Sequence, residues 1–120
     1  MDLDQYSVYY DGTKIEFIDD PSDEIKLMAV AQNGEAIEFI RHPSEEVQLT
    51  AVRQNGEAIR FIEDPSEEVQ YEAVLQNDKA IEFIRDPTET VQLLAIGKCC
   101  NNIRYIDNPT RSVINMCLNK

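Results

Sequence analysis

The five prolines of the chain recur at a fixed spacing of 22 residues, at Pro21, Pro43, Pro65, Pro87 and Pro109. A constant period of this length is the signature of a repeat protein, in which each unit is one supersecondary element that buries its apolar face against its neighbours. We therefore divide a single domain of residues 1–120 into the units 9–30, 31–52, 53–74, 75–96 and 97–118.

Each unit is predicted to contain two helices, because its apolar residues recur at helical spacing and show no period-2 alternation. The longer helix is expected to begin at the proline, with Asp64 as its N-cap, Pro65 at the first helical position and Glu67 completing a capping box. It is expected to end near Asn55, and the following Gly56 is expected to adopt the left-handed conformation. A shorter helix follows the glycine and ends before the next proline.

These units predict an all-α protein, a right-handed α-solenoid of five 22-residue two-helix repeats with a degenerate N-terminal capping helix. Residues 1–8 begin that capping helix, since 3–12 matches 47–56 in phase. The chain stops just after the fifth copy, so we expect a complete domain whose terminal units have a polar outer face.

Units of the form xQNGEAIxFIxxPSEEVQLxAV resemble a family of short helical repeats of unknown function found in bacterial and viral proteins. The QNG, AI-FI and PSEEVQL blocks carry the resemblance over almost the whole chain, and the fifth unit departs from it most, at residues 98–102. More loosely, the chain is similar to leucine-rich variant and HEAT-like repeats. The resemblance implies an α-solenoid from a microbe or phage, and it implies no activity.

The formal net charge of −12 constrains the partners of the chain. Nucleic acid and anionic membranes would repel it, so we expect neither as a direct partner and favour a basic protein surface. Three cysteines form no disulfide framework, and the acidic N-terminus is no signal peptide. We expect a cytoplasmic protein of a bacterial cell or a phage-infected host. It is expected to be a monomer or to associate weakly head to tail, because its first four units are acidic and its fifth is basic.

Acidic residues after the prolines predict a ridge along the stack, formed by Asp23, Glu24, Glu45, Glu46, Glu67, Glu68 and Glu89. Two interpretations stay open. Acids in a first helical turn stabilise the helix through its macrodipole, and a continuous row of carboxylates also imitates a nucleic-acid backbone toward a basic groove. Glu72 and Arg53 lie in columns where side chains vary between units, so they are further candidates for partner binding. Another column predicts ion pairs between neighbouring units because its charges alternate: Asp19, Arg41, Glu63, Arg85 and Asp107.

No residue pattern predicts catalysis, a cofactor or a metal site. His42 is the only histidine, and it falls in the predicted cap column with Asp64. Cys99 and Cys100 are adjacent and are expected to be free thiols, one of them buried, while Cys117 has no assigned role.

The glutamines fall into two groups. Those before the turn asparagines, such as Gln54, are expected to form a hydrogen-bond ladder between units, because buried polar groups need partners. The mid-helix glutamines Gln48, Gln70 and Gln92 lie between apolar columns, and the sequence leaves both burial and exposure open for them.

These patterns favour a non-enzymatic protein-interaction module, an acidic helical-repeat surface that binds a basic protein partner. The alternative is a phage-type inhibitor of a host nuclease or defence protein that acts as a nucleic-acid mimic. An enzyme or ligand carrier with a pocket in the concave face has only the cysteines in its favour.

Overall fold

A computed structural model describes residues 1–119, and over that range the chain is all-helical, with no β-strand. Six α-helices alternate with five short 3-10 helices. The α-helices are α1 (Leu3–Tyr10), α2 (Asp23–Gln32), α3 (Glu45–Gln54), α4 (Glu67–Gln76), α5 (Glu89–Lys98) and α6 (Arg111–Leu118). The 3-10 helices are η1 (Gly12–Phe17), η2 (Gly34–Phe39), η3 (Gly56–Phe61), η4 (Asp78–Phe83) and η5 (Cys100–Tyr105).

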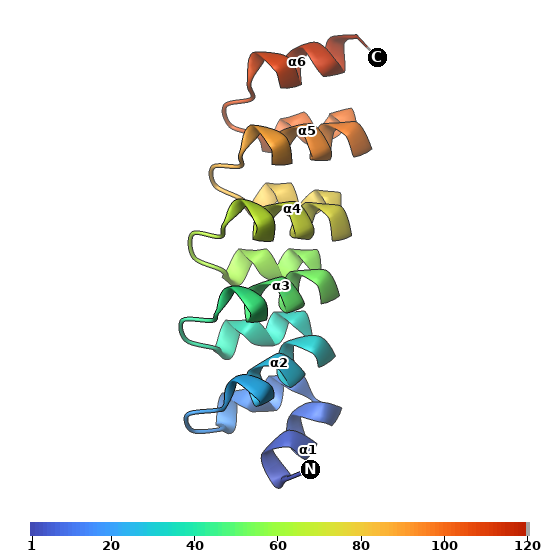
Figure 1. Ribbon diagram of the computed structural model, residues 1–120. Helices are drawn as coiled ribbons and strands as arrows, with labels where there is room; N and C mark the ends of the chain where they lie inside the picture. The colour runs from blue at the N-terminus through green and yellow to red at the C-terminus, as the bar shows by residue number, and fades with distance from the viewer. Residues whose placement is uncertain (120) are drawn as a thin grey trace.

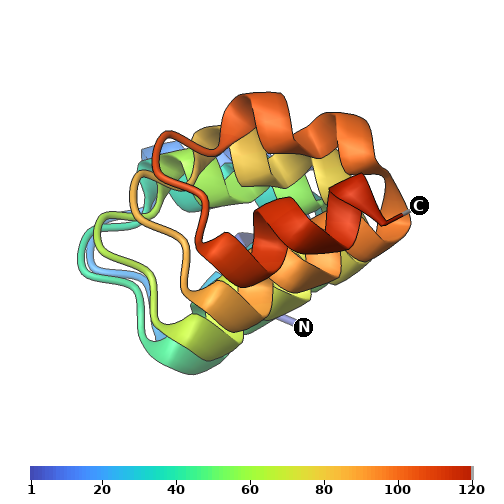
Figure 2. The ribbon, with the colours of Figure 1, turned by 90° about the horizontal axis from the view of Figure 1, so that it is seen from above.

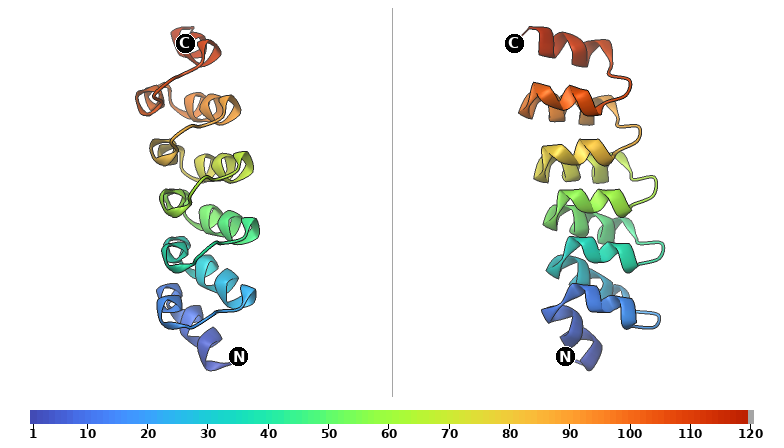
Figure 3. Two further views of the ribbon diagram at one scale, coloured as in Figure 1. Left: turned by 90° about the vertical axis from the view of Figure 1, so that its left-hand side faces the viewer. Right: turned by 180° about the vertical axis from the view of Figure 1, so that it is seen from behind.

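Consecutive helices pack against one another and build a rod (Figure 1) with extents of 56 × 21 × 17 Å. From the side, the α-helices and the 3-10 helices form two columns along the rod (Figure 3). The view along the rod shows the connecting loops gathered on one edge (Figure 2). We call this edge the loop edge; its segments are 18–22, 40–44, 62–66, 84–88 and 106–110. The prediction of an all-helical chain with stacked helices is confirmed.

A continuous apolar core lies between the two columns. Near the middle of the rod, Ala51 and Val52 of α3 and Ala58 and Ile59 of η3 are at most 1% exposed. Their counterparts 22 residues away in the preceding and following units are buried as well. The same positions therefore fill the core at each level, as the sequence period predicts.

The main α-helices begin after a serine or threonine of the loop edge. Ser66 is the N-cap of α4, and its Oγ accepts a hydrogen bond from the backbone N–H of Val69 at 3.3 Å. Asp64 lies two residues before this cap, with a φ of 54°. An N-cap residue needs extended backbone angles, so the predicted cap at Asp64 and its capping box with Glu67 are wrong. His42 has the same left-handed backbone, with a φ of 49°.

An asparagine ends each of α2, α3 and α4 and begins the 3-10 helix that follows, whereas Asp11 and Cys99 take this place after α1 and α5. The Asn55 N–H bonds to the Ala51 carbonyl oxygen at 2.9 Å, and the Asn55 side chain accepts from the Glu57 N–H at 3.1 Å. An i to i+3 bond from the Ala58 N–H to the Asn55 carbonyl oxygen then starts η3. The predicted helix end at the asparagine is confirmed.

The turn glycines allow close packing between units. No glycine among residues 1–119 has a positive φ, so the predicted left-handed role of Gly34 and Gly56 is wrong. A Cβ added at Gly56 would lie 2.4 Å from the carbonyl oxygen of Ala73 in α4. Glycine is needed because η3 lies against the backbone of the next helix, a tertiary contact that turn chemistry alone does not reveal.

Candidate binding surface

Glutamines at the ends of three α-helices tie successive units together. Each side-chain Oε1 accepts a hydrogen bond from the backbone N–H of the glycine that opens the 3-10 helix of the preceding unit. The pairs are Gly12–Gln32, Gly34–Gln54 and Gly56–Gln76, with N···O distances of 2.6, 2.6 and 2.5 Å. The predicted ladder between units is confirmed, and it holds the surface columns in register.

The mid-helix glutamines form a second set of contacts under the loop edge. Gln70 and Gln92 are buried. The Gln70 Nε2 donates to the Pro65 carbonyl oxygen at 3.1 Å, and its Oε1 accepts from the Thr88 N–H of the next loop at 3.3 Å. Both side chains are buried because the following loop covers them. Gln48 is half-buried and bonds the carbonyl oxygen of Pro43 in the same way.

The predicted acidic ridge lies at the N-terminal ends of α2 to α5, beside the loop edge. All seven of its carboxylates are exposed: Asp23, Glu24, Glu45, Glu46, Glu67, Glu68 and Glu89. The Asp23 carboxylate lies 4.0 Å from the ammonium of Lys26, and the Glu45 carboxylate accepts a hydrogen bond from the Ser66 hydroxyl at 2.6 Å. The other five side chains make no ion pair or hydrogen bond within residues 1–119. The ridge is therefore an open row of charge.

The other two candidates for partner binding contact each other. The Arg53 guanidinium of α3 lies 3.2 Å from the Glu72 carboxylate of α4. This half-exposed ion pair joins α3 to α4 within the third unit. A partner that binds either side chain must therefore compete with the other.

The column of alternating charge forms no ladder of ion pairs. Its members are all exposed, and in the described part of the chain none lies within 4.0 Å of an opposite charge: Asp19, Arg41, Glu63, Arg85 and Asp107. An ion pair between neighbouring units joins Arg60 and Glu35 at 3.3 Å instead. The predicted pairing is wrong because these side chains stand at separate loop tips, where solvent screens them.

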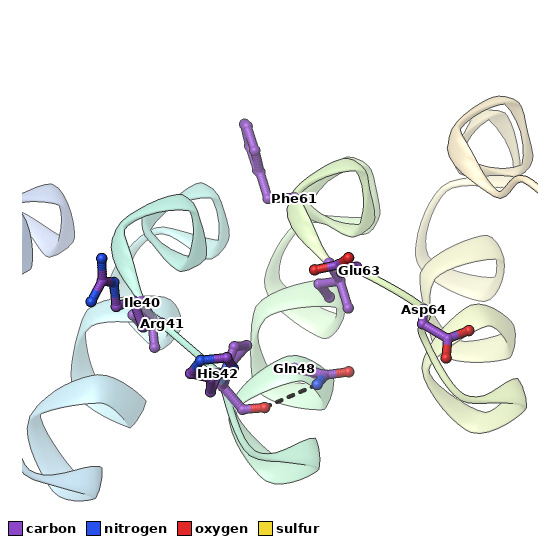
Figure 4. A pocket seen from close by; sticks show the side chains of 9 residues that line it. Ile40, Arg41, His42, Gln48, Phe61, Glu63 and Asp64 are labelled. Carbon is purple, nitrogen blue, oxygen red and sulfur yellow. Dashed lines mark hydrogen bonds between the residues drawn. The ribbon is translucent and has the colours of Figure 1, made fainter.

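Three grooves cut across the loop edge between successive loops, and the lining positions repeat from one groove to the next. Figure 4 shows the central groove, which is lined by Arg41 and His42 of one loop and by Glu63 and Asp64 of the next, with the Arg41 and Asp64 side chains pointing away from each other. Phe61 also lines the groove, and its ring points away from the other labelled side chains (Figure 4). The grooves on either side use the residues 22 positions earlier and later. No prediction from sequence identified these grooves, although the repeated Phe-Ile pair before each loop is the signal that could have done so.

The junction between the fourth and fifth units is built differently. Asp78 replaces the turn glycine, and the fully buried Asn102 replaces a core alanine. The Asn102 amide donates to the Asp78 carboxylate at 2.7 Å and to the Ala95 carbonyl oxygen at 3.0 Å, while the Lys79 ammonium donates to the Asn102 Oδ1 at 3.0 Å. The hydrogen bond from Asn102 lowers the pKa of Asp78 against the opposing effect of burial, with help from the charges of Lys79 and Lys98.

The fifth unit also contains the cysteines. Cys99 takes the place of the turn asparagine, and it makes no side-chain cap for η5. No disulfide joins Cys99, Cys100 and Cys117, all of which are half-buried, so the expectation of one buried thiol in the adjacent pair is wrong. Within residues 1–119, no group of three or more His, Cys, Asp or Glu side chains is placed to hold a metal ion.

No helix in the described range is both long and apolar enough to cross a membrane. Comparisons of the chain with protein-family models, with curated proteins and with solved structures found no match. The resemblance to short bacterial and viral helical repeats therefore stays a prediction.

Proposed function

We propose that the chain is a non-enzymatic protein-interaction module whose acidic helical-repeat surface binds a basic protein partner in the cytoplasm. The finer architecture belongs to the same proposal: a right-handed solenoid of five two-helix repeats with an N-terminal capping helix. The helix starts of α2 to α6 lie 22 residues apart, which supports this division. The rod presents equivalent side chains at each level, and that is the surface an extended partner needs.

The observation that carries the proposal is the open acidic ridge. Five of its carboxylates lie at helix N-terminal ends and make no ion pair or hydrogen bond within residues 1–119. The helix macrodipole accounts for their presence there, and the same charges still attract cationic groups. Exposed pairs contribute only about 0–1 kcal/mol each, so binding requires several ridge carboxylates to act together and falls as salt screens them.

A charge-matched pair of variants tests this proposal. The first carries Glu45→Gln, Glu46→Gln, Glu67→Gln and Glu68→Gln in the ridge. The control makes the same change in charge elsewhere, with Asp4→Asn, Glu38→Gln, Glu82→Gln and Asp107→Asn. The probe is a 12-residue peptide of alternating arginine and serine, titrated by calorimetry at 50 and 200 mM salt.

We expect the ridge variant to lose about tenfold in affinity and the control less than about threefold, since roughly 1.4 kcal/mol corresponds to a factor of ten. Affinity of the unaltered chain should fall between the two salt concentrations. Equal losses in the two variants would mean that net charge alone, and not the ridge, attracts the peptide.

The second candidate function is a nucleic-acid mimic that inhibits a host nuclease or defence protein. The continuous course of the ridge along the rod favours it. Its charge density does not, because the ridge offers about two carboxylates per helix spacing of about 10 Å, whereas duplex DNA carries about six phosphates over that length. Displacement of DNA from a non-specific nuclease by the chain, abolished in the ridge variant and steeply salt-dependent, would raise this reading above the first.

A further inference from the structure

The first helix has an apolar face that no other part of the described chain covers. Leu3, Tyr6 and Tyr10 lie three and four residues apart, so they share one face of α1, and all three are exposed. Leu3 is 84% exposed, whereas Ile25 and Val47, at the same position of the next two units, are 7% and 1% exposed. The difference arises because α2 and α3 each pack against a preceding α-helix. α1 therefore presents to solvent a surface of the kind that is buried inside the stack.

The last helix has an exposed apolar face as well, at the opposite end of the rod (Figure 1). Ile114 and Leu118 lie one turn apart on α6, and both are exposed. Leu118 is 76% exposed, whereas Ile96, at the same position one unit earlier, is fully buried. A 3-10 helix follows each of α1 to α5, and none follows α6 within residues 1–119. The prediction of polar outer faces is therefore wrong for both terminal helices.

The two ends carry opposite charge. Among residues 1–17 four are acidic and one is basic, and among residues 97–119 three are basic and one is acidic. Asp4 follows Leu3 on α1, and Arg111 lies three residues before Ile114, on the same face of α6. Neither Asp4 nor Arg111 makes an ion pair in the described range. The apolar face of each end is thus bordered by a charge that the other end can pair.

We infer that copies of this chain associate head to tail, with the α1 face of one copy packed against the α6 face of the next. The junctions inside the rod show the kind of contact, because there consecutive α-helices pack side by side over buried apolar columns. Charge selects this pairing of ends. A contact between two α1 faces or between two α6 faces would bring like charges together, which disfavours it.

The size of the ends limits the strength of this contact. The rod is 21 × 17 Å across, so each end offers roughly 360 Å², against about 800 Å² per partner in a standard stable interface. The net charge of −12 on each copy also opposes association. At physiological salt the Debye length of about 8 Å leaves mainly the charges near the contact to interact. The association is therefore weak and needs a high protein concentration.

A head-to-tail contact has a consequence that a symmetric dimer lacks. Its two surfaces differ, so a copy that has joined at one end keeps a free surface at the other, and the assembly grows into an open chain. Damage to either surface must then prevent association. Two copies with damage at opposite ends still have one intact surface each, so together they form a dimer that cannot grow.

Sedimentation equilibrium on the full chain and three double variants tests this rule, at about 0.05 to 2 mM protein in physiological salt. Circular dichroism checks that each variant keeps its helices, as expected when the substituted side chains are exposed. The control changes a leucine and a tyrosine on the side of α4, both of them exposed. The variants are Leu3→Ser with Tyr6→Ser for the first end, Ile114→Ser with Leu118→Ser for the last end, and Tyr71→Ser with Leu75→Ser for the control.

We expect the mean mass of the unaltered chain to rise above the 13.8 kDa of the monomer and to pass the dimer as concentration increases. Each end variant should lose at least about tenfold in association constant, the loss typical of removing large side chains from the centre of an interface. The control should associate like the unaltered chain. An equal mixture of the two end variants should form dimers and nothing larger. Arg111→Glu should weaken association about threefold, the effect of an exposed charge pair.

Three results would overturn the inference. The unaltered chain could stay monomeric up to the highest concentration, or the control could lose as much as the end variants, which would indicate unspecific adhesion. If only one end variant lost association, the contact would join two identical ends. The ridge lies on the side of the rod, so the ridge variant should still associate. Failure here with intact binding of the arginine-serine peptide leaves the proposed function standing, and the reverse result leaves the head-to-tail contact standing.

Discussion

The fourth junction between units differs from the first three in how the 3-10 helix packs against the next α-helix. At the first three, glycine lets a 3-10 helix approach the backbone of the next α-helix, and a glutamine accepts the glycine N–H. At the fourth, Asp78 brings a carboxylate into that position and Asn102 bonds to it from the following 3-10 helix. The first three junctions pack closely because glycine has no side chain, and the fourth is held by a hydrogen bond between two side chains.

This difference shows that two departures from the repeat compensate for each other. Asp78 alone would face the next helix without a donor, and Asn102 alone would bury an amide in a column of alanines. Together they satisfy each other, and Lys98 replaces the missing glutamine by donating to the Leu75 carbonyl oxygen at 2.6 Å. The units can therefore change their contacts in pairs while the stacking is kept.

The largest expected effect breaks a regular junction. Gly56→Ala places a Cβ 2.4 Å from a backbone carbonyl oxygen of α4, so we expect a loss of about 3 kcal/mol in the free energy of unfolding by overpacking. Gly97→Ala is the control, because its Cβ would meet nothing closer than 3.5 Å. Gly97 lies within α5, and alanine should stabilise that helix by about 0.5–1 kcal/mol. Urea denaturation measures both, and effects of the same sign would contradict the steric explanation.

A second, smaller effect tests whether the fourth junction acts as a pair. Asn102→Ala removes the donor to the Asp78 carboxylate, and we expect it to lower the free energy of unfolding by about 2 kcal/mol. Asp78→Gly leaves the buried Asn102 amide short of an acceptor and should cost about 1 kcal/mol. The double variant returns both positions to the residues of the repeat, so it should cost less than the sum by about 1–2 kcal/mol. Additive losses in this cycle would show that the two residues do not compensate each other.

The smallest effect is a pH dependence confined to the fourth junction. Because the pKa of Asp78 in the folded chain is below its ordinary value of 3.8, its carboxylate contributes stability that is fully present above pH 3.8. That contribution disappears as the pH falls through the lowered folded value. The difference in stability between the chain and Asp78→Asn should therefore shrink on acidification below pH 3.8. Thermal denaturation at a series of pH values measures this difference in stability. A difference that stays constant or grows below pH 3.8 would rule out this linkage.

Much of the frame could be predicted from sequence because the period is so regular. The helix ends at Asn55 and Asn77, the glutamine ladder and the acidic first turns all follow from the spacing and from local capping rules. The cap itself could not be decided locally, since both Asp64 and Ser66 are good N-cap residues around the same proline. In the structure the N-cap is Ser66, because Asp64 has a left-handed backbone and belongs to the loop that crosses between the two columns.

The surface was harder to predict than the frame. The ridge could be predicted because each of its members lies in the first turn of a predicted helix. The burial of Gln70 depends on how one loop lies over the next, which no local pattern encodes, whereas the three grooves left a signal in the repeated Phe-Ile pair before each loop. The Asp78–Asn102 pair did leave a signal, because both residues depart from their repeat columns in adjacent units.

Small-angle X-ray scattering, with molar mass measured on the same sample in low and high salt, tests most directly whether the units form an open stack. For a monomer, the rod predicts a radius of gyration close to the 16.2 Å of its Cα positions. A compact globule of this length would give about 14 Å. A monomer near the smaller value would contradict the stacked rod, and with it the ridge and the row of grooves.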